Sequence, residues 1–249
     1  MIPKIIHYCW LSGDAYPRDV KACIKSWKKF LPDYEIWLWD FNRFPIDQCV
    51  WVKEAFEARK YAFAADYIRM YALYNYGGIY LDSDVEVLKS YNDLLDLPYF
   101  IGQENSPSGI EAATIGAEPG HPFFKKMLDS YEGRHFILPD GSPDISTPLP
   151  YSMRQCIDDN FKYHLMKSGC AEFINDINII NVFPVDYFSP KEWYSQNLQL
   201  TENTYSIHHF ASSWMPADRK PVKKSSLRKM IDNMRVRLAL GKRIKKIFG

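Results

Sequence analysis

The chain has 249 residues, of which 47% are hydrophobic and 24% charged, so it can form one large α/β domain or two small ones and is neither disordered nor fibrous. The formal net charge of +1 hides a strong asymmetry. Residues 219–249 hold 12 basic residues and one acidic residue, a net +11, whereas residues 1–218 hold 19 basic and 29 acidic residues, a net −10. A basic segment on an acidic protein predicts that this segment meets an anionic surface, and the acidic remainder argues against a nucleic-acid partner.

The cysteines and the N-terminus indicate the compartment. The five cysteines are odd in number and form no C-x-x-C pair, which predicts neither a disulfide framework nor a zinc site and is typical of a reducing cytosol. The first residues contain no continuous apolar stretch before a small-residue cleavage site, and no run of about 20 apolar residues follows. We therefore expect neither a secretion signal nor a membrane span.

In chain order, the N-terminal elements alternate between strand and helix. A strand is expected over 4–10, a helix with helical apolar spacing over 17–30, and a second strand over 35–39. A further helix over 61–76 is stopped by two glycines, and the strand that follows, 79–81, ends in Asp-Ser-Asp. This order predicts an α/β fold with a parallel sheet at its start.

The remaining elements are less regularly spaced. We expect strands over 99–102, 112–117, 177–183 and 204–210, helices over 122–131 and 151–167, and a long loop over 138–150. Residues 225–248 have the pattern of a basic amphipathic helix. The interpretation is one α/β domain over 1–217, a Rossmann-like mixed sheet flanked by helices, followed by a basic helical tail over 218–249.

The strongest local motif is the Asp-x-Asp pair, Asp82 and Asp84. Carboxylates at the end of a buried strand lie where α/β sheets open their binding crevice, and there they can hold a hard divalent cation that neutralises a diphosphate. Asp-x-Asp alone is a weak pattern, because Asp is also common in turns. Two acids at the end of an apolar strand repel each other unless a cation is present, which favours the metal site.

A second pair, Asp66 and Arg69, lies one helix upstream at i, i+3 spacing and therefore on one helix face. An exposed ion pair would contribute little. The surrounding helix is nearly apolar on every side, however, which predicts that it lies in the interior. A buried acid and arginine need polar partners, and a hydroxylated ligand can supply them.

Together these motifs resemble those of DXD glycosyltransferases of family 32, which include bacterial capsule and lipopolysaccharide sugar transferases and fungal mannosyltransferases and are similar to the catalytic domain of large glucosylating bacterial toxins. The resemblance lies in IPKIIHYCW (residues 2–10), ADYIR (65–69), GGIYLDSD (77–84) and HHFASSW (208–214). It implies a GT-A fold, a nucleotide-sugar donor, Mn²⁺ or Mg²⁺, and retention of anomeric configuration.

The resemblance also implies roles for individual residues. Trp10 would stack on the nucleobase, although core packing is the alternative, and the backbone around Tyr8 would contact base or ribose. Asp66 and Arg69 would bind donor-sugar hydroxyls, and Tyr80 would line the donor site. Asp82 would contact ribose or sugar and reach the cation through water, and Asp84 would ligate it directly.

The late motif departs from the toxin pattern. Counting back from Trp214 gives Ser212, and His209 stands where the toxins place a metal-binding acid. Imidazole suits Mn²⁺ better than Mg²⁺. In a strand His208 and His209 point to opposite faces, so we expect one of them to ligate and choose His209. Ser212 and Trp214 would contact the diphosphate.

Two other segments attract attention without a firm catalytic role. Glu104 and Glu111 lie on segments that could border the acceptor side, but the sequence assigns neither a function. His121, before a proline, resembles a family element that precedes a helix, and we expect it to cap or pack.

The predicted function is a retaining, metal-dependent hexosyltransferase. It would move a hexose, with UDP-galactose or UDP-glucose as the first candidate donor, to a lipid-linked glycan acceptor in bacterial surface-polysaccharide synthesis. The alternatives are a transferase acting on protein, a metal-dependent phosphohydrolase or nuclease, and a non-catalytic binding module. The tail either binds an anionic membrane, which would place a cytoplasmic enzyme on the inner face of the cell membrane, or packs on its own domain.

Overall fold

A computed structural model of the protein describes residues 1–106, 109–167 and 170–211. The predictions for Ser212 and Trp214, the domain boundary at residue 217 and the basic tail lie outside the described residues.

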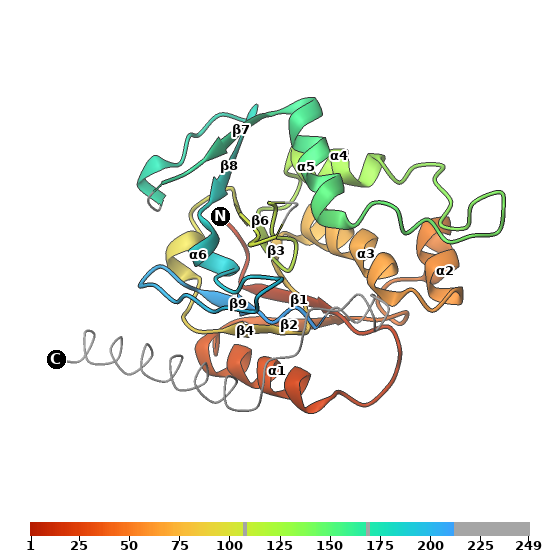
Figure 1. Ribbon diagram of the computed structural model, residues 1–249, viewed down its shortest axis with the longest axis horizontal. Helices are drawn as coiled ribbons and strands as arrows, with labels where there is room; N and C mark the ends of the chain where they lie inside the picture. The colour runs from red at the N-terminus through yellow and green to blue at the C-terminus, as the bar shows by residue number, and fades with distance from the viewer. Residues whose placement is uncertain (107–108, 168–169, 212–249) are drawn as a thin grey trace.

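In the described part of the chain, seven strands form one mixed sheet in the order β2-β1-β3-β6-β5-β8-β7. Of these strands, β6 alone runs against the others, pairing antiparallel with both β3 and β5 (Figure 1). The strands are β1 (Ile5–Cys9), β2 (Glu35–Trp39), β3 (Gly78–Leu81), β5 (Tyr99–Gly102), β6 (Thr114–Ala117), β7 (Lys162–Leu165) and β8 (Ile179–Phe183). The central strands β3, β5 and β6 are buried along their whole length because helices or strands cover both faces.

The helices divide between the two faces of the sheet (Figure 1). One face is covered by α1 (Arg18–Phe30) and α6 (Val185–Phe188), and the other by α3 (Tyr61–Tyr76), α4 (Pro122–Asp129) and α5 (Leu149–Asn160), with α2 (Val50–Glu57) packed against α3. Short 3₁₀ helices lie at Ile46–Gln48, Asn92–Leu94 and Cys170–Glu172.

A separate antiparallel pair, β4 (Val85–Val87) and β9 (Ser206–His208), lies on the α1 side of the sheet. Its register places His208 opposite Val85, so this pair brings the end of the described chain next to the residues that follow β3. Trp27 of α1 fixes β4 from below by donating its indole N–H to the Val85 carbonyl at 2.7 Å.

The expected α/β class, mixed sheet and flanking helices are confirmed, and helix α3 has the predicted bounds. The helix expected over 151–167 is wrong in its second half, because α5 ends at Asn160 and residues Lys162–Leu165 form strand β7. Helix α2 and strand β4 were not predicted. Among the described helices, none combines the length and apolarity that crossing a bilayer requires.

Candidate active site

A cavity of about 700 Å³ opens where β1 and β3 end and the antiparallel β6 begins. The reversal of β6 matters here, because it brings the residues that precede β6 to the same edge as those that follow β3. Binding sites of α/β sheets lie at this edge. The lining comes from segments far apart in the chain, including residues 9–12, 61–69, 80–84, 104–106, 112–113, 148–151, 193–194 and 208–211.

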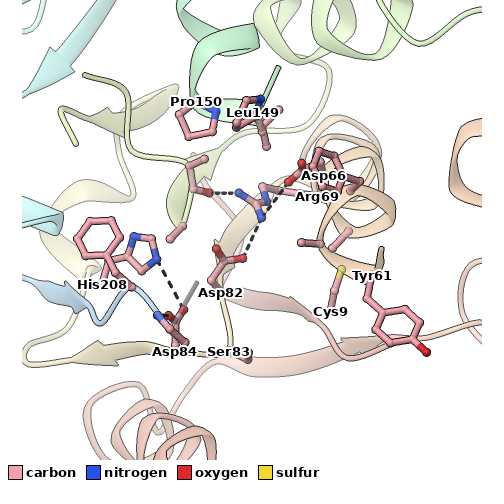
Figure 2. A pocket seen from close by; sticks show the side chains of 18 of the residues that line it. Cys9, Tyr61, Asp66, Arg69, Asp82, Ser83, Asp84, Leu149, Pro150 and His208 are labelled. Carbon is pink, nitrogen blue, oxygen red and sulfur yellow. Dashed lines mark hydrogen bonds and ion pairs between the residues drawn. The ribbon is translucent and has the colours of Figure 1, made fainter. Parts of the chain in front are cut away.

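The α3 wall of the cavity carries the buried ion pair. Arg69 Nη2 lies 3.4 Å from Asp66 Oδ1 and 2.9 Å from Asp82 Oδ1, and Nη1 donates to the Ala112 carbonyl at 2.6 Å (Figure 2). The guanidinium also lies over the Tyr80 ring, 4.4 Å from its centroid. The predicted burial of this pair is confirmed, and the structure shows in addition that the pair lies beside the Asp-x-Asp motif.

Burial shapes the ionisation of this wall. Burial raises the pKa of Asp66 to about 7, and Asp82 adds to this effect while Arg69 opposes it. Burial also raises the pKa of Asp82, although Arg69 opposes the rise. Burial lowers the pKa of Arg69, but the charges of Asp82 and other neighbours outweigh this effect, so the pKa of the guanidinium is raised. The wall thus holds one permanent cation between two acids.

Asp82 and Asp84 are held by backbone contacts on both sides. The Asp82 N–H donates to the Ala113 carbonyl at 2.9 Å, which continues the β3–β6 ladder by one residue. The Asp84 carboxylate accepts from the Ala211 N–H at 2.7 Å. Figure 2 shows Asp82 between Arg69 on one side and Asp84 with His208 on the other.

The structure places His208, and not His209, with these acids. Ligand atoms of Asp82, Asp84 and His208 all lie within 4.8 Å of one another, whereas His209 Nε2 contacts Glu86 at 3.0 Å. The two imidazoles diverge because neighbouring residues of a strand face opposite sides. The choice of His209 rested on a count of residues back from Trp214, and such a count does not determine which face β9 turns to the cavity.

Glu111, a fully buried acid that lies just before β6, contacts His208 on the side of the ring away from Asp84. His208 Nδ1 lies 3.3 Å from Glu111 Oε1, and Nε2 lies 3.7 Å from Asp84 Oδ1. Burial disfavours the charged imidazole, but Glu111 and Asp84 outweigh it and raise the pKa of His208 to about 10. Burial likewise opposes the charged form of Glu111, yet His208 outweighs it and lowers the pKa of this carboxyl.

The donor set fits a divalent cation. Two carboxylates and one imidazole are ligands that suit Mn²⁺, and Mg²⁺ to a lesser degree. Three polar atoms around the cluster are buried and have no hydrogen-bond partner among the described residues: Arg69 Nε, Glu111 Oε2 and His208 Nδ1, which makes only the charge contact with Glu111. Buried polar atoms are rarely left unpaired, so these three are consistent with a site that is completed by a ligand.

Two of the three residues predicted for the nucleotide end, Trp10 and Tyr80, line the cavity, and the prediction for the third, Tyr8, concerned its backbone. Trp10 lines the cavity, with its indole N–H donated to the Asp14 carbonyl at 2.7 Å and its ring edge-on to Tyr16. Tyr80 also lines it. The Tyr8 side chain points into the core on the α1 side, where its ring packs against Trp27 and its hydroxyl forms a hydrogen bond with the Tyr16 hydroxyl.

Some lining residues had no assigned role in the sequence. Glu104 lines the cavity and lies within 4.8 Å of the Glu111–His208 pair, and the aromatic residues Trp193 and Tyr194 lie at the cavity on the segment before β9. The signal for Glu111 was present, since a single acid in the apolar run 110–117 predicts a buried charge with a partner.

Comparison with known proteins finds a family model that matches part of this constellation. The family model described as "Glycosyltransferase sugar-binding region containing DXD motif" matches residues 17–101, which include Asp66, Arg69, Asp82 and Asp84.

Individual relatives agree with the family match. Inositol phosphoceramide mannosyltransferase 3 of Schizosaccharomyces pombe is 35% identical over 51% of this chain, and mannosyl phosphorylinositol ceramide synthase SUR1 of Saccharomyces cerevisiae is 35% identical over 56%. The chain spans little more than a third of these two proteins, 36% and 37%. An uncharacterized glycosyltransferase of Acanthamoeba polyphaga mimivirus is 26% identical over 87% of this chain and 85% of its own length.

Among solved structures, the PaToxG glycosyltransferase aligns with 64% of this chain and 72% of its own, at 21% identity and a TM-score of 0.45. The family match and the curated relatives show that part of this chain, residues 17–101, is similar to the glycosyltransferase sugar-binding region that contains the DXD motif.

Proposed function

We propose that this chain is a metal-dependent glycosyltransferase of the GT-A type that moves a hexose from a nucleotide sugar to an acceptor. The observation that carries the proposal is the meeting, in one cavity, of the Asp82–Asp84–His208 cluster with the buried Asp66–Arg69 pair. The first group suits a cation and the second suits sugar hydroxyls, and a nucleotide sugar needs both.

In this proposal Asp84 and His208 ligate Mn²⁺ or Mg²⁺ and Asp82 reaches the cation directly or through water, so His208 replaces His209 as the predicted ligand. The bound cation would offset the negative charge of the departing nucleoside diphosphate. Arg69 holds Asp82 in place and keeps a positive charge beside the sugar, while its Nε and the Asp66 carboxyl orient hydroxyl groups. None of these aspartates needs to act as a nucleophile, because in the proposed retaining reaction the acceptor attacks from the same face as the leaving group.

The nucleotide would occupy the Trp10 end of the cavity. Trp10 presents an aromatic ring for the base, the backbone beside Tyr8 contacts base or ribose, and Tyr80 supports Arg69 from below. The contacts of Ser212 and Trp214 with the diphosphate remain part of the proposal.

The donor and the acceptor are proposed by class. UDP-galactose and UDP-glucose are candidate donors, and the name of the Schizosaccharomyces pombe mannosyltransferase adds mannose, for which GDP-mannose is our candidate donor. That name also specifies a lipid acceptor, inositol phosphoceramide, which supports a lipid-linked glycan here. We propose a surface-polysaccharide role on the cytoplasmic side of the membrane, and a protein acceptor is the alternative.

A ligand screen tests the donor. Thermal unfolding is followed with Mn²⁺ and each of UDP-glucose, UDP-galactose and GDP-mannose, because a ligand that binds the folded state raises the midpoint by mass action. Release of nucleoside diphosphate is then measured with the donor that stabilises most. Hydrolysis of simple phosphate esters, with no effect of any nucleotide sugar, would favour the phosphohydrolase instead.

The matched variant is Asp84→Ala. We expect it to lose Mn²⁺-dependent turnover while unfolding at nearly the wild-type temperature, since it loses one hydrogen bond from Ala211 worth about 1 kcal/mol. Full activity in this variant would contradict the metal assignment.

A further inference from the structure

Glu111 is a fully buried acid that the proposed chemistry has not yet used. It lies just before β6, and its backbone N–H donates to the Gly102 carbonyl at 2.8 Å. Its Oε1 accepts from the Ala113 N–H at 2.6 Å. A buried carboxylate is costly unless a charged or hydrogen-bonding partner offsets the loss of hydration, so its surroundings are informative.

The partner that faces this carboxylate is the ring of His208. Nδ1 lies 3.3 Å from Glu111 Oε1, while Nε2 on the opposite edge of the ring lies 3.7 Å from Asp84 Oδ1. The imidazole is therefore held between two acids, one on the cavity side and one behind it. Glu111 Oε2 has no hydrogen-bond partner among the described residues.

We propose that Glu111 is a positioning residue for the metal site: its carboxylate faces Nδ1 of His208, an atom with no hydrogen-bond partner among the described residues, and its charge keeps the Nε2 edge of the ring turned towards Asp82 and Asp84. The inference rests on the proposed function only in taking this cluster as a cation site. Histidine ligands commonly donate their other N–H to a carboxylate, which fixes the tautomer and makes the ligating nitrogen a stronger donor.

The neighbouring histidine provides the contrast. His209 makes the same kind of contact with Glu86, at 3.0 Å, but on the other face of β9 and away from the acids of the cavity. The Glu86 side chain is 32% exposed, whereas that of Glu111 is 0% exposed. The chain thus offers two adjacent Glu–His pairs, of which one supports the proposed site.

A purely structural role for Glu111 makes a different prediction. In that case the carboxylate serves only to hold the backbone at Ala113, and a neutral amide of the same size does this equally well. Glu111→Gln keeps an acceptor for the Ala113 N–H but loses the negative charge that faces His208. The substitution therefore separates the two roles.

The test is Mn²⁺ binding, measured from the electron paramagnetic resonance signal of free Mn²⁺ as protein is added. Wild type, Glu111→Gln, Glu86→Gln and Asp84→Ala are compared as full-length chains, without nucleotide sugar. We expect Glu111→Gln to weaken Mn²⁺ binding by about 10- to 100-fold, the range found for supporting carboxylates. Glu86→Gln should bind as wild type does, and Asp84→Ala should lose binding.

A failure of the Glu111 inference can be told apart from a failure of the proposed metal site. Equal binding by wild type and Glu111→Gln, with binding lost in Asp84→Ala, would overturn the inference and leave the proposed metal site intact. Wild type that binds no Mn²⁺ would overturn both. If Glu111→Gln does not fold, Glu111→Asp answers the same question, because it keeps the charge but withdraws the carboxylate from the ring by one methylene. Wild-type affinity in Glu111→Asp would count against positioning.

Discussion

A single guanidinium joins three parts of the candidate site. Arg69 on α3 contacts Asp66 on its own helix, Asp82 after β3 and the Ala112 carbonyl before β6. Because its side chain is only 6% exposed, the two acids depend on it for compensation of their charge. The same group therefore stabilises the fold and sets the electrostatic potential of the cavity.

Replacing Arg69 tests this dependence. Arg69→Met should reduce the free energy of unfolding by about 3–5 kcal/mol, because it leaves buried acids without a cation, and Arg69→Lys should cost less because it keeps the charge but not the fork of donors. Urea unfolding measures both. The control is Arg154→Met, which removes an exposed pair with Asp158 and should cost under about 1 kcal/mol. Equal losses in the two Met variants would refute the argument.

At this scale the sequence predicted four of the charged residues that the structure places around the cavity. Asp66, Arg69, Asp82 and Asp84 could be chosen because helix spacing and the end of a buried strand are local features. The choice between His208 and His209 could not be made locally, since it depends on how β9 docks on β4. Glu111 lacked a role for the same reason, because its partner lies far away in the sequence.

Among the elements, the turn from α3 into β3 is constrained by its two glycines. Gly77 and Gly78 both have positive φ, 63° and 91°. A Cβ on Gly78 would lie 2.7 Å from the Ile5 carbonyl oxygen of the neighbouring strand. This turn sets the direction of β3, at whose end Asp82 and Asp84 line the cavity.

Gly78→Ala should therefore destabilise the protein by about 2–5 kcal/mol, as left-handed strain and a backbone clash act together. The matched control is Gly133→Ala, where φ is 67° but nothing lies within 4 Å of the added Cβ. We expect only the conformational cost there, about 1–2 kcal/mol. Chemical denaturation of both variants measures the difference, and identical losses would rule out the clash.

The N-terminus of α4 makes the stability depend on pH. His121 Nδ1 accepts from the Phe123 N–H at 3.3 Å, which confirms the expected cap. Burial lowers the pKa of His121 to about 4, below its ordinary 6.5, while Glu118 opposes this. Between these two values the unfolded chain binds more protons than the folded one, so stability is complete above pH 6.5 and is lost as the pH falls towards 4.

His121→Asn keeps a good capping residue but does not titrate. We expect wild type to lose more of its free energy of unfolding than this variant does when urea unfolding is repeated at pH 5 instead of pH 7. Denaturation curves that stay equally far apart at both pH values would show that His121 does not carry the proton linkage.

The elements themselves were predictable where one periodicity ran without interruption. Helix α3 is apolar and bounded by glycines, and its limits were correct. Strand β7 was assigned to a helix because residues 162–165 follow α5 directly and contain no breaker, and because what makes them a strand is pairing with β8. Strand β4 is three residues long and exists through its contact with β9.

For the whole molecule, charge is separated along the chain, with a net +11 on residues 219–249 and a net −10 on residues 1–218. We predict that the full chain binds vesicles containing anionic lipid at low salt, because juxtaposed Lys and Arg contribute about 1 kcal/mol each at such a surface. Deleting residues 223–249 leaves 21 basic and 29 acidic residues, a net −8, and should abolish this binding. Co-sedimentation at low and high salt, with neutral vesicles as the control, measures it. Unchanged binding after the deletion would exclude the basic segment as the contact.

The pairing of β4 with β9 has a consequence for the order of assembly. Asp82 and Asp84 are synthesised early, but His208 and the Ala211 N–H reach them only after β9 has been made and has docked. A nascent chain therefore has no complete cation cluster until residues 206–211 are available. Ligand binding therefore requires that synthesis has passed β9 and that β9 has docked. A chain cut before β9 should not be stabilised against unfolding by Mn²⁺ and nucleotide sugar.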